Sequence, residues 1–408
     1  MVANNKSESF FLQRLSLILL VVDCVLQFQG IWNLGNISLM VFLIWLFITL
    51  LAFRGVLSKV TKEKRFIAIL LFTLFYFVSS ISVESASVSF NRCIALLSVL
   101  SPALMYEVVR LQSDKFKRNF LVIIGAFLIW NIVESFSFLR SIGADNMRQS
   151  FREYGMDYYI VNRIFDLCYS IAIAIPCFIE IIKNVKLRKP LLVFTICLLF
   201  LFLYYILIAQ YTTAILVSLI LGFVFLLSNR RKSIIISIIL LVFLSQLFIV
   251  FYPSFSSGLN NVEGFDELTY RLDEVYLVLT GQGEKAVDAS SRSNLNLMSF
   301  HTFLSHPLFG VNHKIMGNQH VNFWGIGNHS TWLDSLARYG LFSFLLFIYI
   351  WDSLKKQRKE LGILAPSFTL IILGFLNPIL DFPEVCMTLL IIPLTYEFYK
   401  SKEKQKKI

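Results

Sequence analysis

Residues 191–209 read LLVFTICLLFLFLYYILIA and residues 213–228 read TAILVSLILGFVFLLS, and neither stretch contains a charged side chain. Only Gln210, Tyr211 and Thr212 separate them. Apolar runs of roughly 17–25 residues can cross a hydrocarbon layer about 30 Å thick as helices. The short polar connection allows only a tight turn, so this stretch predicts a helical hairpin within a membrane.

The whole chain has the composition that this hairpin suggests. Of its 408 residues, 57% are hydrophobic, 40 are Phe, and the mean hydropathy is +0.70. Charged residues make up 15%, whereas a soluble domain carries about a quarter. We therefore predict an all-α polytopic membrane protein with about twelve transmembrane helices. The predicted spans are 15–32, 36–53, 66–82, 93–109, 119–138, 159–182, 191–209, 213–228, 234–252, 331–353, 363–380 and 385–399.

Basic residues are concentrated in alternate loops between these spans. Because Lys and Arg are retained on the cytoplasmic side during insertion, the alternation predicts an even number of spans in the cytoplasmic (inner) membrane, with both termini in the cytoplasm. This topology accounts for the net charge of +11, so nucleic acid is not expected as a partner. The basic loops contain Arg54, Lys59, Lys62, Lys64 and Arg65; Arg110, Lys115, Lys117 and Arg118; Lys183, Lys186, Arg188 and Lys189; Arg230, Arg231 and Lys232; and Lys355, Lys356, Arg358 and Lys359.

One long polar segment interrupts the series of spans. Residues 253–328 are predicted to face outward and to form the extracytoplasmic catalytic loop, since loops of this length are usually functional or disordered. Aromatic and aliphatic residues throughout favour an ordered loop, with short helices over 265–280 and 291–304. The organisation is then transmembrane helices 1–9 in 1–252, the loop in 253–328, transmembrane helices 10–12 in 329–399, and a basic cytoplasmic tail in 400–408.

The six cysteines all lie in apolar segments, and none has the spacing of zinc ligands. We interpret them as small hydrophobic residues. They are Cys24, Cys93, Cys168, Cys177, Cys197 and Cys386.

All five histidines fall within residues 301–329. Their separations of 5, 7, 7 and 9 residues include no H-E-x-x-H or H-x-H pair, which disfavours a metal site. An acid–base or phosphate-contacting role for at least one imidazole is the favoured interpretation. The alternative is that polar residues simply gather in the large polar loop. The histidines are His301, His306, His313, His320 and His329.

His329 stands directly before an apolar span, in Asn328-His329-Ser330-Thr331-Trp332-Leu333. Asn328 or Ser330 is a suitable N-cap for the helix that follows. His329 would then lie at a helix N-terminus near the outer membrane surface, where anions are stabilised. A neutral imidazole there can remove a proton from a sugar hydroxyl, and a charged one can bind phosphate.

These residues belong to a longer pattern. Arg292, then His306-Pro307-Leu308-Phe309-Gly310, then Asn328-His329-Ser330 with Leu333, then Tyr339-Gly340-Leu341 resemble the signature of the O-antigen ligase and polymerase superfamily of Wzy-type membrane polysaccharide polymerases. That family shows an Arg, an H-P-L-x-G turn, and an H-[NS]-x-x-L…G-L run that enters a membrane helix. The motif covers about 50 residues. The span count, orientation and late outward loop extend the resemblance over most of the chain.

The resemblance implies a GT-C-like membrane glycosyltransferase. Its expected reaction is polymerisation of undecaprenyl-diphosphate-linked oligosaccharide repeat units into capsular polysaccharide, exopolysaccharide or O-antigen, on the outer face of the cytoplasmic membrane and without a metal or other cofactor. The expected partners are the lipid-linked oligosaccharide, the lipid bilayer, a chain-length regulator and a flippase. By position, Arg292 matches the family's loop Arg and His329 its proposed base or phosphate-contacting His, so we expect the two to share a cavity.

Other cations are candidates for binding the diphosphate or sugar. Arg163 lies near the outer end of a predicted span, where an ionisable residue is costly and indicates function, although it could instead snorkel to the interface. The preceding outward loop contains three arginines, Arg140, Arg148 and Arg152. Basic residues are disfavoured in outward loops, so their presence suggests an anionic partner, and the alternative is a solvated face. His306, in the turn of the motif, is the remaining candidate.

The chain departs from the family at one place. Many members carry a Ser-Arg pair at the hairpin between two spans, whereas this chain has Gln210-Tyr211-Thr212-Thr213-Ala214. If that position requires an Arg for the diphosphate, another residue must replace it, and Arg163 or Arg148 are the candidates.

The carboxylates near the motif are predicted to be less important. Asp334 follows His329 by five positions, about 140° around a helix, so it is not expected to orient the imidazole. Asp381 and Glu384 cap the short outward turn between the last two spans. Solvated interface groups are the favoured interpretation, and the alternative is that they approach the site.

Three alternative functions remain. Within the family, a ligase would transfer the glycan to another carrier. A polytopic transporter or flippase of lipid-linked oligosaccharide would suit twelve spans, but the spans show neither an internal repeat nor ionisable residues near the midplane. A non-catalytic assembly protein would need no outward His or Arg.

Overall fold

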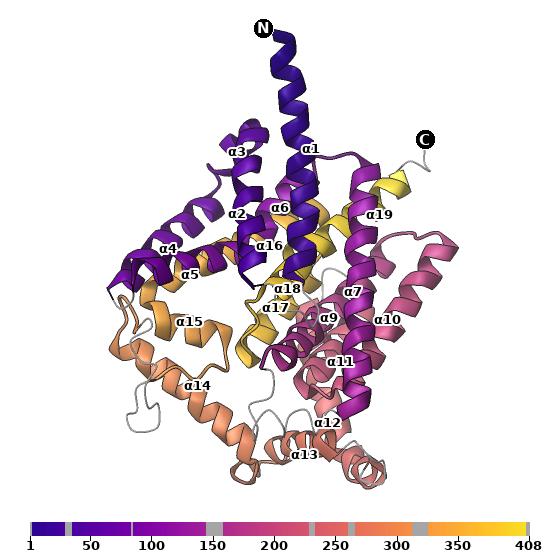
Figure 1. Cartoon of the computed structure of the whole chain (residues 1–408). Coiled ribbons are helices and arrows are strands. Elements are labelled where there is room, and N and C mark those ends of the chain that lie inside the picture. Colours follow the sequence, from indigo (N-terminus) through magenta and orange to yellow (C-terminus); the bar gives the residue numbers. More distant parts are fainter. Residues whose placement is uncertain are drawn as a thin grey trace.

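The protein is built from helices that run between two opposite ends. The computed structural model describes residues 2–28, 35–82, 85–143, 158–227, 233–259, 266–311 and 325–404, and these residues contain no strand. The N-terminal end of α1 and the C-terminal end of α19 both lie in the upper part of Figure 1, whereas α13 and α14 lie in the lower part.

The helices follow the predicted spans closely in position. The N-terminal half contains α1 (Val2–Gln27), α2 (Gly35–Ala52), α3 (Arg54–Val60), α4 (Lys64–Ile81), α5 (Ala86–Leu100), α6 (Pro102–Val109) and α7 (Asp114–Ile142). The middle contains α9 (Tyr158–Asn184), α10 (Lys189–Ala209), α11 (Thr212–Leu227), α12 (Ser233–Leu259), α13 (Asp266–Leu279), η1 (Gly283–Lys285) and α14 (Val287–Ser305). The last part contains α15 (Thr331–Tyr339), η2 (Gly340–Phe342), α16 (Ser343–Leu361), α17 (Ala365–Leu376), α18 (Phe382–Cys386), η3 (Met387–Ile391) and α19 (Ile392–Lys404).

The lengths and composition of these helices are those of a helical membrane protein. Among the described residues, six helices can cross a membrane, or seven if α5 and α6 form one span that bends by 47°. The apolar segments Ile37–Ala52, Thr212–Leu227 and Ala365–Leu376 are shorter. The predicted count of twelve spans thus remains a prediction. The six are Phe10–Gln27, Lys64–Ile81, Asp114–Ser141, Arg163–Asn184, Lys189–Ala209 and Thr331–Leu361.

Several boundaries differ from those predicted. The predicted span 93–109 is broken at Ser101, where Pro102 begins α6, because proline lacks the N–H that would continue the helix. The span predicted over 331–353 contains the short helix η2 at Gly340. α12 continues through Pro253 to Leu259, so the long polar segment begins later than residue 253.

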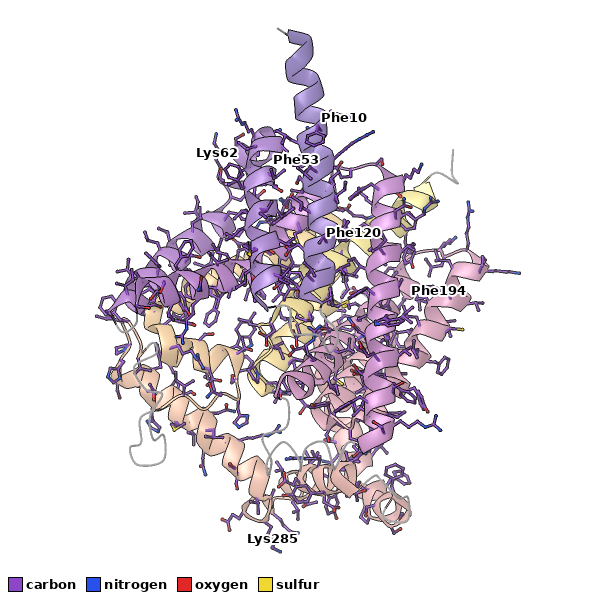
Figure 2. The ribbon with its side chains drawn as sticks, viewed as in Figure 1. Phe10, Phe53, Lys62, Phe120, Phe194 and Lys285 are labelled. Carbon is purple, nitrogen blue, oxygen red and sulfur yellow. The ribbon has the colours of Figure 1, made fainter. Side chains whose placement is uncertain are left out.

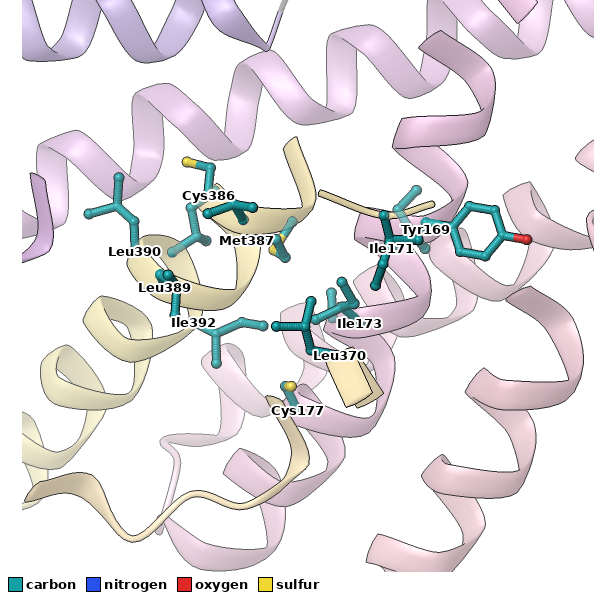
Figure 3. Close-up of a cluster of buried hydrophobic side chains, with 14 of the residues drawn as sticks. Tyr169, Ile171, Ile173, Cys177, Leu370, Cys386, Met387, Leu389, Leu390 and Ile392 are labelled. Atoms are coloured by element: carbon teal, nitrogen blue, oxygen red, sulfur yellow. The ribbon is translucent and has the colours of Figure 1, made fainter. Parts of the chain in front are cut away.

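α9 forms the centre of the molecule. It packs against α10, α11, α17 and α18, and its small and β-branched side chains allow neighbouring helices to approach closely. Figure 3 shows this core, in which Ile173 of α9 lies beside Leu370 of α17, and Cys177 of α9 and Leu389 of η3 belong to the same cluster. These residues are all buried.

The outer surface of the helices is apolar, the reverse of a soluble protein. Phe194 and Phe200 on α10 and Leu74 on α4 are each more than half exposed, and Phe194 projects from the outer side of α10 in Figure 2. Contiguous exposed apolar surface of this kind marks contact with a membrane or a partner.

At the end that contains both termini, an ion network joins α4, α6 and α16. The buried Arg65 guanidinium donates to carboxylates of Glu63 and Glu107. Lys356 of α16 donates to the same two carboxylates at 2.8 and 2.7 Å, and Arg110 lies 3.1 Å from Glu107. Because each buried charge has an opposite partner, the network fixes these three helices together without leaving an isolated charge.

The network predicts a pH dependence of stability. Partial burial raises the pKa of the Glu63 carboxyl, but the hydrogen bond from Lys356 and the charges of Arg65 and Lys356 lower it more, so the pKa lies below its ordinary value of 4.5. The ionised Glu63 carboxylate therefore stabilises the folded protein fully above pH 4.5. This stabilisation is lost as the pH falls through the lowered pKa of Glu63 in the folded state. We expect the apparent melting temperature to fall less between pH 6 and pH 3.5 in Glu63→Gln than in the unsubstituted protein. An equal fall in both would contradict this account.

The buried carboxylate of Glu180 caps a helix, and its removal should destabilise the protein. Glu180 of α9, 4% exposed, accepts hydrogen bonds from the backbone N–H groups of Leu364 and Ala365 at 2.8–3.0 Å, at the start of α17. Glu180→Ala leaves those donors without this acceptor, so we expect a loss of about 1–3 kcal/mol, measured as a lower melting temperature in detergent. Glu360→Gln, which removes an exposed partner of Arg110, is the control and should change it little.

Candidate functional site

A cavity of about 600 Å³ opens at the end of the molecule opposite the termini. Its walls come from α9, α11, α13, α14 and α17, together with the α10–α11 turn and the loop before α15. The side chains that line it are Phe165, Tyr169, Gln210, Tyr211, Thr212, Thr213, Leu216, Val217, Ile220, Leu221, Arg271, Glu274, Val275, Val278, Leu279, Arg292, Asn296, His329, Ile372, Leu376 and Asn377.

The lining of the cavity contains both polar and apolar side chains. Arg271, Arg292 and His329 supply cationic or ionisable groups, and Glu274 is the only carboxylate among the described residues of the lining. Leu216 and Ile220 of α11 and Ile372 and Leu376 of α17 are among the apolar residues. A cavity with this mixed lining suits an amphiphilic anion.

The loop that carries His329 is fixed to α14. The Thr302 hydroxyl donates to the carbonyl of Gly325 at 2.7 Å and accepts from its N–H at 3.0 Å. The Ser299 hydroxyl accepts from the N–H of Gly327 at 2.8 Å. Gly327 lies so close to α14 that an added Cβ would be 2.4 Å from the carbonyl oxygen of Leu295. The backbone before His329 therefore follows α14, which also carries Arg292.

Asp334 joins α14 to the start of α15. Its Oδ1 accepts from the Ser299 hydroxyl at 2.6 Å, and its Oδ2 accepts from the N–H of Ser330 at 2.9 Å. Ser330, one of the two predicted caps, is the N-cap, and its hydroxyl accepts from the N–H of Leu333 at 3.3 Å. Asp334 thus fixes the backbone beside His329 through Ser330, although sequence analysis had treated it as unimportant.

The other side of the same segment is attached to α17. Ser330 donates to the carbonyl of Gly374 at 3.2 Å, and the Thr331 hydroxyl donates to the carbonyl of Asn377 at 3.0 Å. The indole N–H of Trp332 donates to the carbonyl of Ile371 at 3.0 Å. His329 is therefore placed between two helices that both form walls of the cavity.

The turn of the sequence motif has a packing role. Gly310 and Gly340 both have positive φ angles, of 65° and 56°. A Cβ at Gly310 would lie 2.3 Å from the carbonyl oxygen of Arg338, and one at Gly340 would lie 2.4 Å from that of Pro307. The two glycines therefore let the turn after α14 pack directly against the end of α15. His306 ends α14, is exposed, and is not among the residues that line the cavity.

The remaining predicted cations are placed differently. Arg292 and His329 line the one cavity. Arg163 donates to the carbonyl of Phe28 at 2.5 Å and is not in the lining. Arg140 lies exposed in the last turn of α7, and Arg148 and Arg152 lie outside the described residues.

Sequence analysis missed Arg271. It lies on α13, and the amide oxygen of Gln210, at the hairpin turn, accepts from the N–H of Leu268 at 3.2 Å. This bond attaches α13 to the turn where the family pattern carries an Arg, and Arg271 lines the cavity beside it. The only signal in the sequence was an Arg within a short acidic helix, 61 positions beyond Gln210.

Polar atoms in the lining lack partners. The side-chain Nδ2 of Asn377, Oδ1 of Asn296 and Oγ1 of Thr212 are buried, with no hydrogen-bond partner in the described structure. Asn377 is itself only 5% exposed. Buried polar groups are normally hydrogen-bonded, so these three atoms are unsatisfied polar groups on side chains that line the cavity.

One predicted solvated residue is buried. Glu384 of α18 is fully buried, and neither of its carboxylate oxygens has a partner among the described residues, whereas Asp381 is exposed. The expectation that Glu384 is solvated was wrong, because α18 packs against α5, α6 and α9. Neither residue lines the cavity.

Within the described ranges, no group of three or more His, Cys, Asp and Glu residues could hold a metal ion. His313 and His320 lie outside those ranges. Neither a scan against protein-family models nor a search of curated proteins returns a match for the chain.

The geometry predicts that Asp334 holds the loop of His329. Asp334→Ala removes the acceptor for Ser330 N–H and Ser299 Oγ, so the backbone amides of residues 327–330 should exchange hydrogen faster. Asp352→Ala, on α16, is the matched control and should leave that exchange unchanged. Unaltered protection of residues 327–330 in Asp334→Ala would show that the carboxylate does not position them.

Proposed function

We propose that the protein is a membrane polysaccharide polymerase, which transfers a growing glycan from undecaprenyl diphosphate to the sugar hydroxyl of another lipid-linked repeat unit. The proposal includes the GT-C-like arrangement of about twelve spans and both termini in the cytoplasm. The observation that supports it best is the cavity that Arg271, Arg292 and His329 line together with apolar side chains.

The cavity matches the chemistry of a lipid diphosphate. Arginine binds phosphate oxygens through paired N–H donors, and two arginines from separate helices can contact both phosphates. The apolar side chains of α11 and α17 suit a polyprenyl chain, and the amides of Asn296 and Asn377 suit sugar hydroxyls. A volume of about 600 Å³ lies within the usual range for a small-molecule site.

The proposed reaction needs charge stabilisation and a proton acceptor. The acceptor hydroxyl oxygen attacks the anomeric carbon, the bond from that carbon to the phosphate oxygen breaks, and the diphosphate leaves with the electron pair. Arg271 and Arg292 stabilise its charge. His329 either accepts the hydroxyl proton or contacts the phosphate.

The position of the cavity favours an outward site. Lys62 lies at the same end as both chain termini, and the ion network of Arg65, Arg110 and Lys356 also lies there. The cavity lies at the other end. By the positive-inside rule, the terminal end is cytoplasmic. A transporter would carry its ionisable groups near the midplane. A ligase would use the same groups with a different acceptor, and it is the nearest alternative.

Three substitutions test the proposal in cells whose polysaccharide synthesis requires this protein. Arg271→Ala, Arg292→Ala and His329→Ala should each lower long-chain polymer by about 100-fold or more, because each removes a group that stabilises or serves the transition state. Single lipid-linked repeat units and the abundance of the protein should remain. Polymer length is read by gel electrophoresis, and repeat units by mass spectrometry.

Lys285→Ala, an exposed outward residue, is the matched control and should leave chain length normal. Normal chain length in all three cavity variants would remove the catalytic proposal. Accumulation of repeat units on the cytoplasmic leaflet would indicate a flippase. Normal polymer that fails to reach its final carrier would indicate a ligase.

A further inference from the structure

α14 has an exposed apolar stripe on the side away from the protein. Leu297, Phe300 and Leu304 are 50%, 41% and 55% exposed, and their spacing of three and four residues places them on one face of the helix. The opposite face carries Ser299 and Thr302, which are hydrogen-bonded to the loop at Gly325 and Gly327. These bonds prevent the helix from rotating to bury the stripe.

The character of the exposed face changes along the helix. Towards the N-terminal end, Ser293 and Asn294 are exposed and polar. Towards the C-terminal end, the apolar stripe begins and continues beyond the helix into Leu308 and Phe309, 57% and 62% exposed. His301 and Ser305 border the stripe and are also exposed. A helix with this gradient suits an oblique position in which only its C-terminal half enters an apolar phase.

The stripe is continuous with the outer surface of a membrane-spanning helix. The ring of Phe309 lies 6.4 Å from that of Phe75 on α4 and 5.8 Å from that of Phe342. Phe75 is six residues from the end of α4 at Ile81, which corresponds to about 9 Å along the helix axis. Next to it, Leu74 and Val78 of the same span are 60% and 62% exposed.

We propose that the C-terminal half of α14, with the turn after it, lies in the outer leaflet of the membrane and that lipid acyl chains cover Leu297, Phe300, Leu304, Leu308 and Phe309. α14 is then an interfacial helix, not a free part of an outward loop. Since Arg292 lies in the more polar N-terminal half of the same helix, membrane contact sets the height of Arg292 relative to lipid headgroups. The inference does not depend on the reaction proposed for the cavity.

Site-specific fluorescence tests the inference in the full-length protein. In a Cys197→Ser background, whose remaining cysteines are buried, Leu304→Cys and Ser293→Cys are each labelled with an environment-sensitive nitrobenzoxadiazole dye. The labelled proteins are reconstituted in phosphatidylcholine and phosphatidylglycerol nanodiscs, with or without lipids that carry a nitroxide on the acyl chain. Iodide serves as the aqueous quencher, and Phe300→Cys provides a second apolar position.

We expect the dyes at positions 304 and 300 to emit at shorter wavelength, to be quenched several-fold more by the nitroxide lipid, and to be shielded from iodide. The dye at position 293 should show the opposite pattern. Equal access of iodide to positions 293, 300 and 304 would overturn the inference. Shielding of positions 300 and 304 from both quenchers would also overturn it, because protein and not lipid would then cover the stripe.

Discussion

Hydrocarbon offers no hydrogen-bond partner to the backbone, and this constraint governs the structure. Several helix starts are satisfied by side chains. Glu180 of α9 caps α17, Ser330 caps α15, and Gln210 accepts from the first turn of α13. Because the backbone is satisfied in this way, helices can begin within the molecule without leaving these donors unpaired. Asn296, Asn377 and Thr212, which each have a buried polar atom without a partner in the described structure, line the cavity.

The charged groups of the cavity are held in place mainly by hydrogen bonds between uncharged groups. Arg271, Arg292 and His329 come from three separate segments, and the bonds that fix those segments are made by hydroxyl, amide and backbone groups together with one buried carboxylate, Asp334. That carboxylate binds Ser299 and Ser330 and does not line the cavity. The described lining therefore has two arginines, Arg271 and Arg292, against one carboxylate, Glu274, and this excess of positive charge favours an anionic ligand.

Local features could be predicted from the sequence, and long-range ones could not. The apolar runs around Gln210 predicted the hairpin of α10 and α11, and residue type limited the cap of α15 to Asn328 or Ser330, of which Ser330 is the cap. The break at Ser101 follows from Pro102, but the break at Gly340 depends on the close approach of Pro307, and the burial of Glu384 depends on tertiary packing. Arg271 was missed because no periodicity within α13 indicates that the N–H of Leu268 binds Gln210 at the α10–α11 turn. The pairing exists only once the chain has folded.

The motif that suggested a function contains two kinds of residue. Gly310, Gly340 and Ser330 are required by close packing, a positive φ angle or a helix cap, and they would serve any protein with this arrangement of helices. Arg292 and His329 are not among these packing and capping positions, and both line the cavity. A guanidinium and an imidazole in one cavity suit the charge of an anionic ligand and the transfer of a proton. The placement of these two residues, and not the presence of the whole motif, is therefore the stronger physical argument for a lipid diphosphate.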